Sequence, residues 1–357
     1  MKFAQQSQPF KRPDMTILER HQQLCRELRL VDEVGFDFAF AAEQHFTQCL
    51  PSPALFCSYG AQHTKRIRLG PMGYVAPFHN PIVIAEEAAV LDTILNGRLE
   101  LGIVPGIIPP HFEVLNADWA NRGKRTEEAI QLVKAIAGGT GPIDFTGPFH
   151  QYKGAKLTVP TVQKPHPPLW RMSRTPKELA FLAAEGVNTG YLLFAPRATV
   201  APYYRDYLKQ WKAAGHKHKP RVAFATMGYV DETDELARAK AAQHIVHSLV
   251  MIYGSGFGGS TDGLVQSYLD RGEPGAAEAA RNLENAEYYF RNRLVFVGSP
   301  ETVTQQIKEA AIEGCFNTLL MEFNIGMMPE EDIERSIRLF GERVIPALRD
   351  FEPADFN

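Results

Sequence analysis

Apolar and polar positions follow one another along the chain as short apolar strands and amphipathic helices. One module of this kind occurs three times: a helix ends in an acidic residue and a glycine, and a short apolar strand follows. The copies are Asp32 to Phe40, Ala184 to Leu193 and Ile312 to Leu320, with Gly35, Gly186 and Gly314 as the expected helix stops. Glycine ends a helix readily because it adopts the left-handed conformation without a Cβ clash. A strand that follows within two residues predicts the tight helix-to-strand return of a parallel sheet.

Further helix signals lie between these copies. Asn80-Pro81 combines an N-cap with a proline in the first turn, and Asn96-Gly97 is the expected stop of that helix. Ser299-Pro300 and Pro329 begin two more helices. The apolar faces at helical spacing are Ile84, Ala88, Leu91 and Leu95 in the first, Val303, Ile307 and Ala310 in the second, and Ile333, Ile337, Phe340 and Val344 in the third.

Apolar runs between the helices predict the strands. They are Lys2 to Gln6, Phe36 to Ala42, Ile67 to Val75, Arg98 to Val104, Pro168 to Met172 and Arg221 to Val230, besides those in the repeated module. About eight strand–helix units can be counted, which favours an α/β fold of the closed (β/α)8 TIM-barrel type over an open doubly wound sheet. The 357 residues fit one barrel as a single domain over 1–357, although two smaller domains are compatible with that length.

Two segments interrupt the alternation and are expected to be insertions. Residues 143–159 are rich in glycine and proline and predict a small hairpin. Residues 251–290 contain a stretch, Tyr253 to Glu273, in which Gly254, Gly256, Gly258, Gly259 and Gly263 lie in a short span. Such a stretch is typical of a lid over an active site or of a tolerated surface loop.

Composition and charge argue against several classes of function. The formal net charge is −3 with 22% charged residues, so no basic field is available for nucleic acid or for a membrane surface. No run approaches the roughly 18 apolar residues of a membrane span, and the first six residues have no signal-like apolar core, so a cytoplasmic protein is expected. Reduced and mostly buried thiols are expected for Cys25, Cys49, Cys57 and Cys315, which form no Cys-x-x-Cys pair, and no metal site is expected.

The active site of such a barrel lies at the C-terminal ends of its strands. Glu43, Gln44 and His45 follow the strand Phe36 to Ala42, and His45 beside Glu43 is either an acid/base pair or a structural histidine. The ends of the next two strands add the candidates Met72, Gly73, Val104, Gly106 and Ile107.

Ser173, Arg174 and Thr175 join a strand to a helix that starts at Pro176. Hydroxyl groups, a guanidinium and free amides at a helix N-terminus suit a phosphate monoester, although Ser or Thr before Pro is also an ordinary helix start. The chain has no Gly-x-Ser-x-Gly, Walker or Rossmann glycine motif, so hydrolysis by a serine nucleophile and nucleoside triphosphate chemistry lack their signatures.

Several ordered blocks resemble the bacterial-luciferase-like flavin monooxygenases. The blocks are Gly35-Phe36-Asp37 leading to Glu43-Gln44-His45-Phe46, Thr64 to Gly70, Asn80-Pro81 leading to Leu91-Asp92, Asn96 to Gly102, Val297 to Val303, and Arg335 to Leu348. They span nearly the whole chain in the family's order, and the length with the insertion near 251–290 is similar to the luciferase α subunit.

The resemblance implies a two-component oxidoreductase. Reduced FMN from a separate flavin reductase would bind at the strand ends and react with O2, and the C4a-peroxyflavin would oxygenate a small organic substrate. It implies that Glu43, Gln44 and His45 are catalytic and that the bond between Met72 and Gly73 is a cis peptide bond. The cofactor-binding residues that it implies are Met72, Gly73, Val104, Gly106, Ile107, Ser173, Arg174 and Thr175. A homodimer, or a heterodimer with a homologous subunit, through the helix Asn80 to Leu95 is implied as well.

Two positions depart from the family pattern. Gln44 stands where the luciferase α subunit has its catalytic first histidine, and glutamine cannot act as a base at neutral pH. Pro105 stands where that subunit has a phosphate-binding arginine, which leaves Arg174 as the candidate cation. Two alternatives therefore stay open: a catalytically silent partner subunit, and a deazaflavin-dependent oxidoreductase, although the glycine-rich phosphate loop of that branch is not apparent at Gly102 to Gly106.

Overall fold

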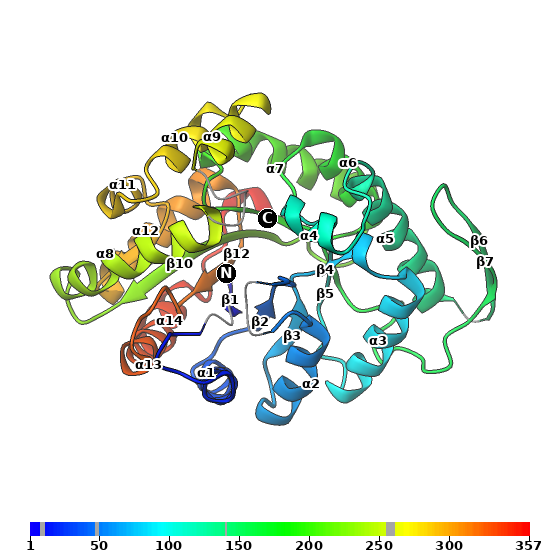
Figure 1. The fold of residues 1–357 in the computed structure, drawn as a ribbon, viewed down its shortest axis with the longest axis horizontal. Helices are drawn as coiled ribbons and strands as arrows, with labels where there is room; N and C mark the ends of the chain where they lie inside the picture. Colours follow the sequence, from blue (N-terminus) through cyan, green and yellow to red (C-terminus); the bar gives the residue numbers. More distant parts are fainter. Residues whose placement is uncertain (8–10, 47–49, 140, 255–260) are drawn as a thin grey trace. The chain divides into compact units, whose positions relative to one another are not determined.

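The computed structural model describes residues 1–7, 11–46, 50–139, 141–254 and 261–357, which divide into two compact units. Unit 1 consists of Met1–Asp37 and Met172–Asn357, and unit 2 consists of Phe38–Arg171. Strands and helices alternate in both units, and neighbouring strands pair in parallel outside one hairpin. This pattern confirms the α/β class (Figure 1).

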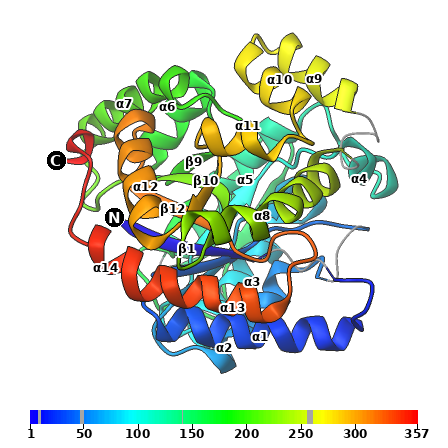
Figure 2. The ribbon, with the colours of Figure 1, turned by 90° about the vertical axis from the view of Figure 1, so that its left-hand side faces the viewer.

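Unit 1 contains strands from both ends of the chain. Its strands are β1 (Lys2–Ser7), β9 (Thr189–Leu192), β10 (Val222–Val230), β11 (Phe296–Gly298) and β12 (Thr318–Glu322). Its longer helices are α1 (Ile17–Glu33), α6 (Pro176–Glu185), α7 (Arg197–Ala213), α8 (Asp234–Leu249), α9 (Thr261–Asp270), α10 (Pro274–Arg281), α12 (Pro300–Gly314) and α13 (Glu330–Leu339), with the shorter α11 (Ala286–Arg291) and α14 (Ile345–Leu348). Figure 2 shows α1 running alongside α13, and the two helices are in contact.

The sheet of unit 1 is organised around β10. β10 pairs in parallel with β9 over residues 222–225, with β12 over residues 223–227, and with β11 over residues 228–230. β12 in turn pairs with β1, with Ala4 opposite Leu320. All five residues of β12 are buried, as expected for a parallel strand covered on both faces.

The three copies of the repeated module fold as helix, stop and strand, but the third stop differs from the prediction. Gly35 and Gly186 have φ of 104° and 68° and end their helices as expected. Gly314 lies inside α12, and Cys315 adopts the left-handed conformation instead, with φ of 53°. Glycine at 314 instead serves a close contact: the hydroxyl of Tyr191 donates to the Gly314 carbonyl at 2.9 Å, and a Cβ at Gly314 would lie 2.1 Å from that hydroxyl.

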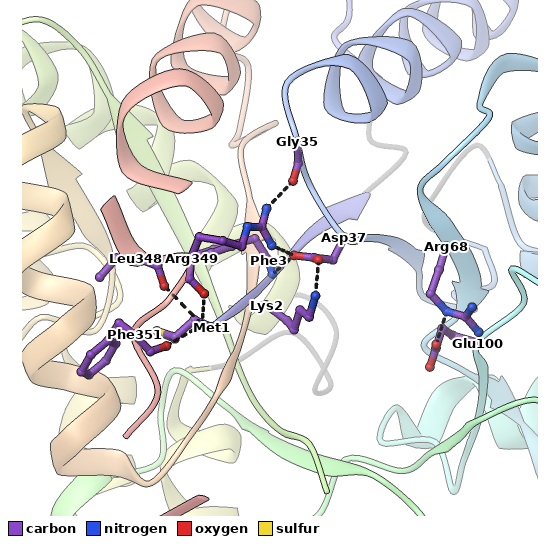
Figure 3. Close-up of polar contacts among 10 residues, drawn as sticks. All are labelled: Met1, Lys2, Phe3, Gly35, Asp37, Arg68, Glu100, Leu348, Arg349 and Phe351. Carbon is purple, nitrogen blue, oxygen red and sulfur yellow. Dashed lines mark hydrogen bonds and ion pairs between the residues drawn. The ribbon is translucent and has the colours of Figure 1, made fainter. Parts of the chain in front are cut away.

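Asp37, the last residue of the Gly35-Phe36-Asp37 block, fastens β1 to the C-terminal part of unit 1 (Figure 3). Its carboxylate accepts from the backbone N–H of Phe3 at 3.0 Å, from Lys2 Nζ at 2.8 Å and from Arg349 Nη1 at 2.6 Å. Arg349 Nη2 also donates to the Gly35 carbonyl at 2.6 Å. One carboxylate thus holds the first helix stop, the first strand and the last helical segment in register.

Unit 2 contains the elements from β2 to β8. They are β2 (Phe38–Ala41), α2 (Pro53–His63), β3 (Arg68–Pro71), β4 (Tyr74–Val75), α3 (Pro81–Ile94), β5 (Leu101–Val104), α4 (Pro109–Val114), α5 (Arg122–Gly138), β6 (Ile143–Thr146), β7 (Gln151–Ala155) and β8 (Leu169–Trp170). β2 pairs with β3, β4 with β5, and β5 with β8, all in parallel. Within 143–159, where a hairpin was expected, β6 and β7 pair antiparallel and project beyond α3 and α5 (Figure 1).

The expected strand Ile67 to Val75 is interrupted in the middle. β3 and β4 are separated by Met72 and Gly73, whose peptide bond is cis, as the family resemblance implies. The backbone here runs against β5: a Cβ at Gly73 would lie 2.5 Å from the Gly102 carbonyl carbon, and one at Gly102 would lie 2.4 Å from the Pro71 oxygen. Only glycine permits this approach.

The buried carboxylate of Glu100 lies at the opposite ends of β3 and β5, where the two strands begin. Glu100 accepts from Arg68 Nε at 2.5 Å, shown in Figure 3, and from Trp170 Nε1 at 2.5 Å. Its side chain is 1% exposed. Arg68 also donates to the carbonyls of Gly97 and Leu99, so one guanidinium ties the end of the α3 turn to the start of β5.

The predicted helix starts and apolar faces are confirmed. The Asn80 side chain accepts from Ile82 N at 3.0 Å, and the Ser299 hydroxyl accepts from Thr302 N at 3.3 Å. The predicted core positions of α3, α12 and α13 are buried. The glycine-rich stretch Tyr253 to Glu273 differs from the loop expected there, because α9 lies inside it and buries Leu264 and Tyr268; residues 255–260 of the expected lid lie outside the described residues.

Within the described chain, Cys57 and Cys315 are buried free thiols and Cys25 is half-buried, which agrees with the expectation; Cys49 lies outside the described residues. Burial raises the pKa of the Cys57 thiol and raises the pKa of Cys315 to about 12. None of the described helices is long and apolar enough to cross a membrane.

The Gly102 contact leads to a stability prediction. Gly102→Ala places a methyl group against the Pro71 carbonyl, so we expect the free energy of unfolding to fall by about 1–3 kcal/mol, measured by urea denaturation. Gly141→Ala is the matched control, because a Cβ there meets nothing within 4 Å, and it should change stability by no more than about 0.5 kcal/mol. Equal stability of the two variants would contradict a backbone contact that requires glycine.

Candidate active site

The candidate residues of unit 2 gather around the carboxylate of Glu43, which follows β2. Its oxygens accept three kinds of donor: the backbone N–H of Val75 at 2.7 Å, His45 Nε2 at 2.7 Å, and His79 Nε2 at 2.8 and 2.9 Å. The Glu43 side chain is 1% exposed, whereas those of His45 and His79 are 22% and 30% exposed. We call Glu43, His45 and His79 the histidine cluster.

The hydrogen bonds of the histidine cluster decide its charges. Burial alone would raise the pKa of Glu43, but donation from His45 and His79 outweighs burial and lowers it. Burial alone would lower the pKa of His79, but its hydrogen bond to Glu43 and the charges of Glu43 and Glu87 raise it. A carboxylate with three donors and an imidazole with a carboxylate partner therefore both favour their charged forms.

His79 owes its place to the short segment between β4 and α3. It directly precedes the Asn80 cap, and its backbone N–H donates to the Ala76 carbonyl at 3.1 Å. The Tyr74 ring meets the His79 ring edge-on at 5.4 Å, and the Tyr74 hydroxyl donates to Glu87 of α3 at 2.8 Å. The sequence analysis interprets Asn80-Pro81 only as a helix start, so it does not include His79 among the site residues. The position of a histidine directly before this cap is the signal that could have indicated it.

Aromatic rings border the histidine cluster. The ring of His45 lies 5.5 Å from Phe78 and 6.1 Å from His111 of α4, measured between centroids. Burial lowers the pKa of His111, and the neighbouring His45 lowers it further. Phe46 has φ of 63° and an exposed side chain, so a large apolar residue is held in an uncommon backbone conformation beside two histidines.

The predicted cofactor residues of unit 2 lie on neighbouring strand ends. Val104 pairs with Val75, the residue whose N–H binds Glu43, and Gly73 lies against Gly102. Gly106 has φ of 75° and lies against Val75 and Phe112, while Ile107 is half exposed. Met72 is buried, and Gln44, next to Glu43, is half-buried. The structure thus brings Glu43, His45, Val104 and Gly106 around Val75, and does not place Ile107 in a described contact with them.

The candidate residues of unit 1 lie where β8 leads into α6, and acidic side chains engage them. The Ser173 hydroxyl donates to Glu178 at 2.5 Å, and the Thr175 hydroxyl donates to the same carboxylate at 3.0 Å. Arg174 donates through Nε and Nη2 to the two oxygens of Glu273, at 2.8 and 2.5 Å. The predicted helix start at Pro176 is confirmed, with Thr175 as the N-cap residue.

Two guanidinium groups converge on Glu273. Arg271 Nε lies 3.4 Å from the same carboxylate, and Arg174 and Arg271 lie over the Tyr268 ring at 5.7 and 4.8 Å from its centroid. Burial alone would raise the pKa of Glu273, but the hydrogen bond from Arg174 and the charges of both arginines lower it. We call Arg174, Arg271, Tyr268 and Glu273 the arginine cluster. The sequence prediction missed its last three members, since they lie in the stretch that was expected to be a loop.

The described residues contain no group of three or more His, Cys, Asp or Glu side chains placed to hold a metal ion. The side chains of the two clusters are of types that take part in proton transfer and anion binding. The histidine cluster supplies an imidazole oriented by a carboxylate, and the arginine cluster supplies a partly buried bidentate cation.

The chain is similar to several known proteins. The chain is 34% identical to the oxygenase component of the flavin-dependent trigonelline monooxygenase of Acinetobacter baylyi over 234 residues, which is 61% of each protein. Two solved structures share its fold: the oxygenating constituent of 3,6-diketocamphane monooxygenase from Pseudomonas putida in complex with FMN (TM-score 0.79, 19% identity, 97% and 98% covered), and the coenzyme F420 dependent tetrahydromethanopterin reductase of Methanopyrus kandleri (TM-score 0.71, 19% identity, 97% and 98% covered).

These likenesses confirm the predicted luciferase-like (β/α)8 fold. The chain spans about three-fifths of the length of the trigonelline enzyme that it matches. The model of the luciferase-like monooxygenase family matches residues 1–316. The chain belongs to the luciferase-like monooxygenase family.

Proposed function

We propose that this protein is a monooxygenase that uses FMNH2 and O2 to oxygenate a small organic substrate, with reduced flavin supplied by a separate reductase. The observation that carries the proposal is the histidine cluster, in which a buried carboxylate orients His45 beside exposed apolar side chains. The flavin, when bound, supplies the oxygen activation, and the protein supplies orientation, exclusion of water and proton transfer. The name of the trigonelline enzyme, an oxygenase component, supports the separate reductase.

Arg174 and the neighbouring hydroxyls of Ser173 and Thr175 are of the types that fit the phosphate of FMN. A phosphate monoester needs a bidentate cation and short hydrogen-bond donors, and Arg174 with the hydroxyls of Ser173 and Thr175 provides both types. Glu273 now binds Arg174 as a carboxylate ligand would. A dianionic phosphate carries more charge than this carboxylate, so we propose that it replaces Glu273 on Arg174 and thereby compensates for Pro105.

His45 is the proposed acid/base. An ionised carboxylate only accepts hydrogen bonds, so His45 Nε2 carries the hydrogen that it shares with Glu43. In the neutral ring Nδ1 is then the basic nitrogen. Gln44, which has no basic nitrogen, is proposed to act by hydrogen bonding alone.

Exposed side chains support the proposed dimer. The helix α3 buries one apolar face and exposes another, at Val83, Val90 and Ile94, which are 43–45% exposed. Leu55 of the neighbouring α2 is 59% exposed. A second subunit, identical or homologous, would cover this face.

Two alternatives rest on particular observations. A silent partner subunit would keep Arg174 permanently bound by Glu273 and would not bind flavin. A deazaflavin-dependent oxidoreductase is supported by the fold shared with the coenzyme F420 dependent reductase. Flavin binding separates the first alternative from an enzyme, and the choice between FMN and the deazaflavin separates the second.

The proposed function predicts what an anaerobic titration will show. The protein should bind FMNH2, and O2 added to the complex should produce a transient absorbance band distinct from those of FMN and FMNH2, followed by stopped-flow spectroscopy. Binding of the deazaflavin F420 but not of FMNH2 would favour the oxidoreductase alternative. Binding of neither would favour the silent subunit.

The proposed phosphate site predicts opposite effects for its two partners. Arg174→Ala should weaken FMN binding about 10- to 100-fold and riboflavin binding much less, because only FMN carries the phosphate. Glu273→Gln should strengthen FMN binding, because it removes the competing negative charge. Isothermal titration measures both, and Arg205→Ala is the control, since Arg205 pairs with Asp355 at an exposed position. Equal losses for FMN and riboflavin in Arg174→Ala would exclude a phosphate contact.

The acid/base assignment predicts a graded loss of activity. His45→Ala should slow single-turnover oxygenation by about 100-fold or more, whereas Gln44→Ala should cost less. The rates are measured on folded, flavin-saturated protein, with melting temperatures compared first. A normal rate for His45→Ala under these conditions would leave His45 with a structural role only.

A further inference from the structure

Glu322 is the last residue of β12, and its carboxyl group is buried without a full set of hydrogen bonds. Its Oε1 atom has no hydrogen-bond partner among the residues that the structure describes. Asn324, two positions further on, is also buried, and its Nδ2 atom likewise has no partner within the described ranges. Buried polar groups without partners destabilise a fold. Two of them at the end of one strand indicate a place where a bound molecule completes the hydrogen bonds.

The direction of the Glu322 side chain follows from the alternation along the strand. Phe323, the next residue, packs edge-on against Phe36 and Phe340, at 5.7 and 5.2 Å between ring centroids. Neighbouring residues of an extended chain point to opposite faces, so Glu322 points away from the helical segment that contains Phe340. In a (β/α)8 barrel the helices cover the outside, and the active site lies at the C-terminal ends of the strands. Glu322 therefore lies on the inner face of its strand, at the active-site end.

The surroundings of Glu322 favour its neutral form. Burial raises the pKa of this carboxyl group well above its usual value. Arg20 of α1 acts in the opposite direction, but Arg20 pairs with Glu27 at 3.3 Å, and the charge of Glu27 raises the pKa of Glu322 further. Tyr253 is a titratable neighbour in the π-helical turn Val250–Gly254 that follows α8, and burial raises its pKa as well, so it brings no charge. A neutral carboxyl group can donate one hydrogen bond through its hydroxyl.

We propose that Glu322 binds reduced flavin as a neutral hydrogen-bond donor and so makes the site prefer FMNH2 to FMN. This inference rests on the proposed function and deepens it. Reduced flavin loses its N1 proton readily, and the negative charge then lies on N1 and the C2 carbonyl. A neutral acid donates to these atoms, whereas an ionised carboxylate would repel them. An oxygenase that receives its flavin from a reductase needs this preference, because oxidised FMN would otherwise occupy the site.

The first measurement compares the two oxidation states of the cofactor. Glu322→Gln keeps a neutral donor, because the amide N–H replaces the hydroxyl, whereas Glu322→Leu has no donor on a side chain of similar size. FMNH2 and FMN are titrated anaerobically into the full-length variants. We expect Glu322→Leu to weaken FMNH2 binding about 10- to 100-fold and FMN binding much less. Glu322→Gln should keep the preference of the unchanged protein for FMNH2.

The second measurement follows the charge of Glu322 without any flavin. Above about pH 4.5, Glu322 is ionised in the unfolded chain but protonated in the folded protein, so rising pH favours unfolding, and Glu322→Gln lacks this effect. The unfolding constant of the unchanged protein divided by that of Glu322→Gln, measured by urea denaturation, should therefore rise about tenfold per pH unit between about pH 5 and 7. Glu284→Gln is the control, because Glu284 is exposed, and the corresponding ratio should not rise in this way.

Each outcome decides the inference. A ratio of unfolding constants that does not change with pH would show that Glu322 is ionised and would overturn it. Equal losses of FMN and FMNH2 affinity in Glu322→Leu, or no loss of either, would overturn it and leave the proposed function intact. If Glu322→Leu does not fold, Glu322→Met takes its place in the same titrations. An unchanged protein that binds neither flavin refutes the proposed function and the flavin role of Glu322 with it, whatever the unfolding constants show.

Discussion

The burial of ionised carboxylates is the constraint on which the architecture of unit 2 depends. Glu43 and Glu100 each have a side chain that is 1% exposed, and a buried charge is tolerated only with hydrogen bonds and a counter-charge. Glu100 meets this condition with Arg68 and Trp170, which connect three strands. Glu43 meets it with two histidines and the β4 backbone. The same requirement connects strands at Glu100 and, at Glu43, orients His45, the proposed acid/base.

The arginine cluster of unit 1 follows the same rule with the signs exchanged. Arg174 is a half-buried cation, and its bidentate contact with Glu273 satisfies it through the chain's own residues. A site that binds an anion must hold a cation out of bulk water, and such a cation needs a partner when the ligand is absent. Glu273 is that partner for Arg174. In the proposed phosphate site, binding would therefore gain only the difference between the interaction of Arg174 with a phosphate and its interaction with a carboxylate.

Local signals made much of the fold predictable, and contacts between distant residues made the rest unpredictable. The Asn80 and Ser299 caps, the apolar faces of α3, α12 and α13, and the strand ends that hold Glu43 and His45 all follow from residues within one or two turns. His79 could not be assigned in the same way, because its partner lies 36 positions earlier in the chain. Gly314, predicted as a helix stop, instead makes room for Tyr191, more than a hundred residues away. The glycines of 253–273 indicated a loop, but burial of Leu264 and Tyr268 stabilises a helix there.

The burial of the cysteines has a consequence for oxidative self-damage. Reduced flavin that meets O2 without a substrate produces hydrogen peroxide, and peroxide attacks cysteine as the thiolate rather than as the thiol. Burial raises the pKa of Cys57 and of Cys315, so both thiols stay protonated at cellular pH. Among the described cysteines, the buried thiols Cys57 and Cys315 are therefore protected from the peroxide that a flavin-dependent oxygenase generates.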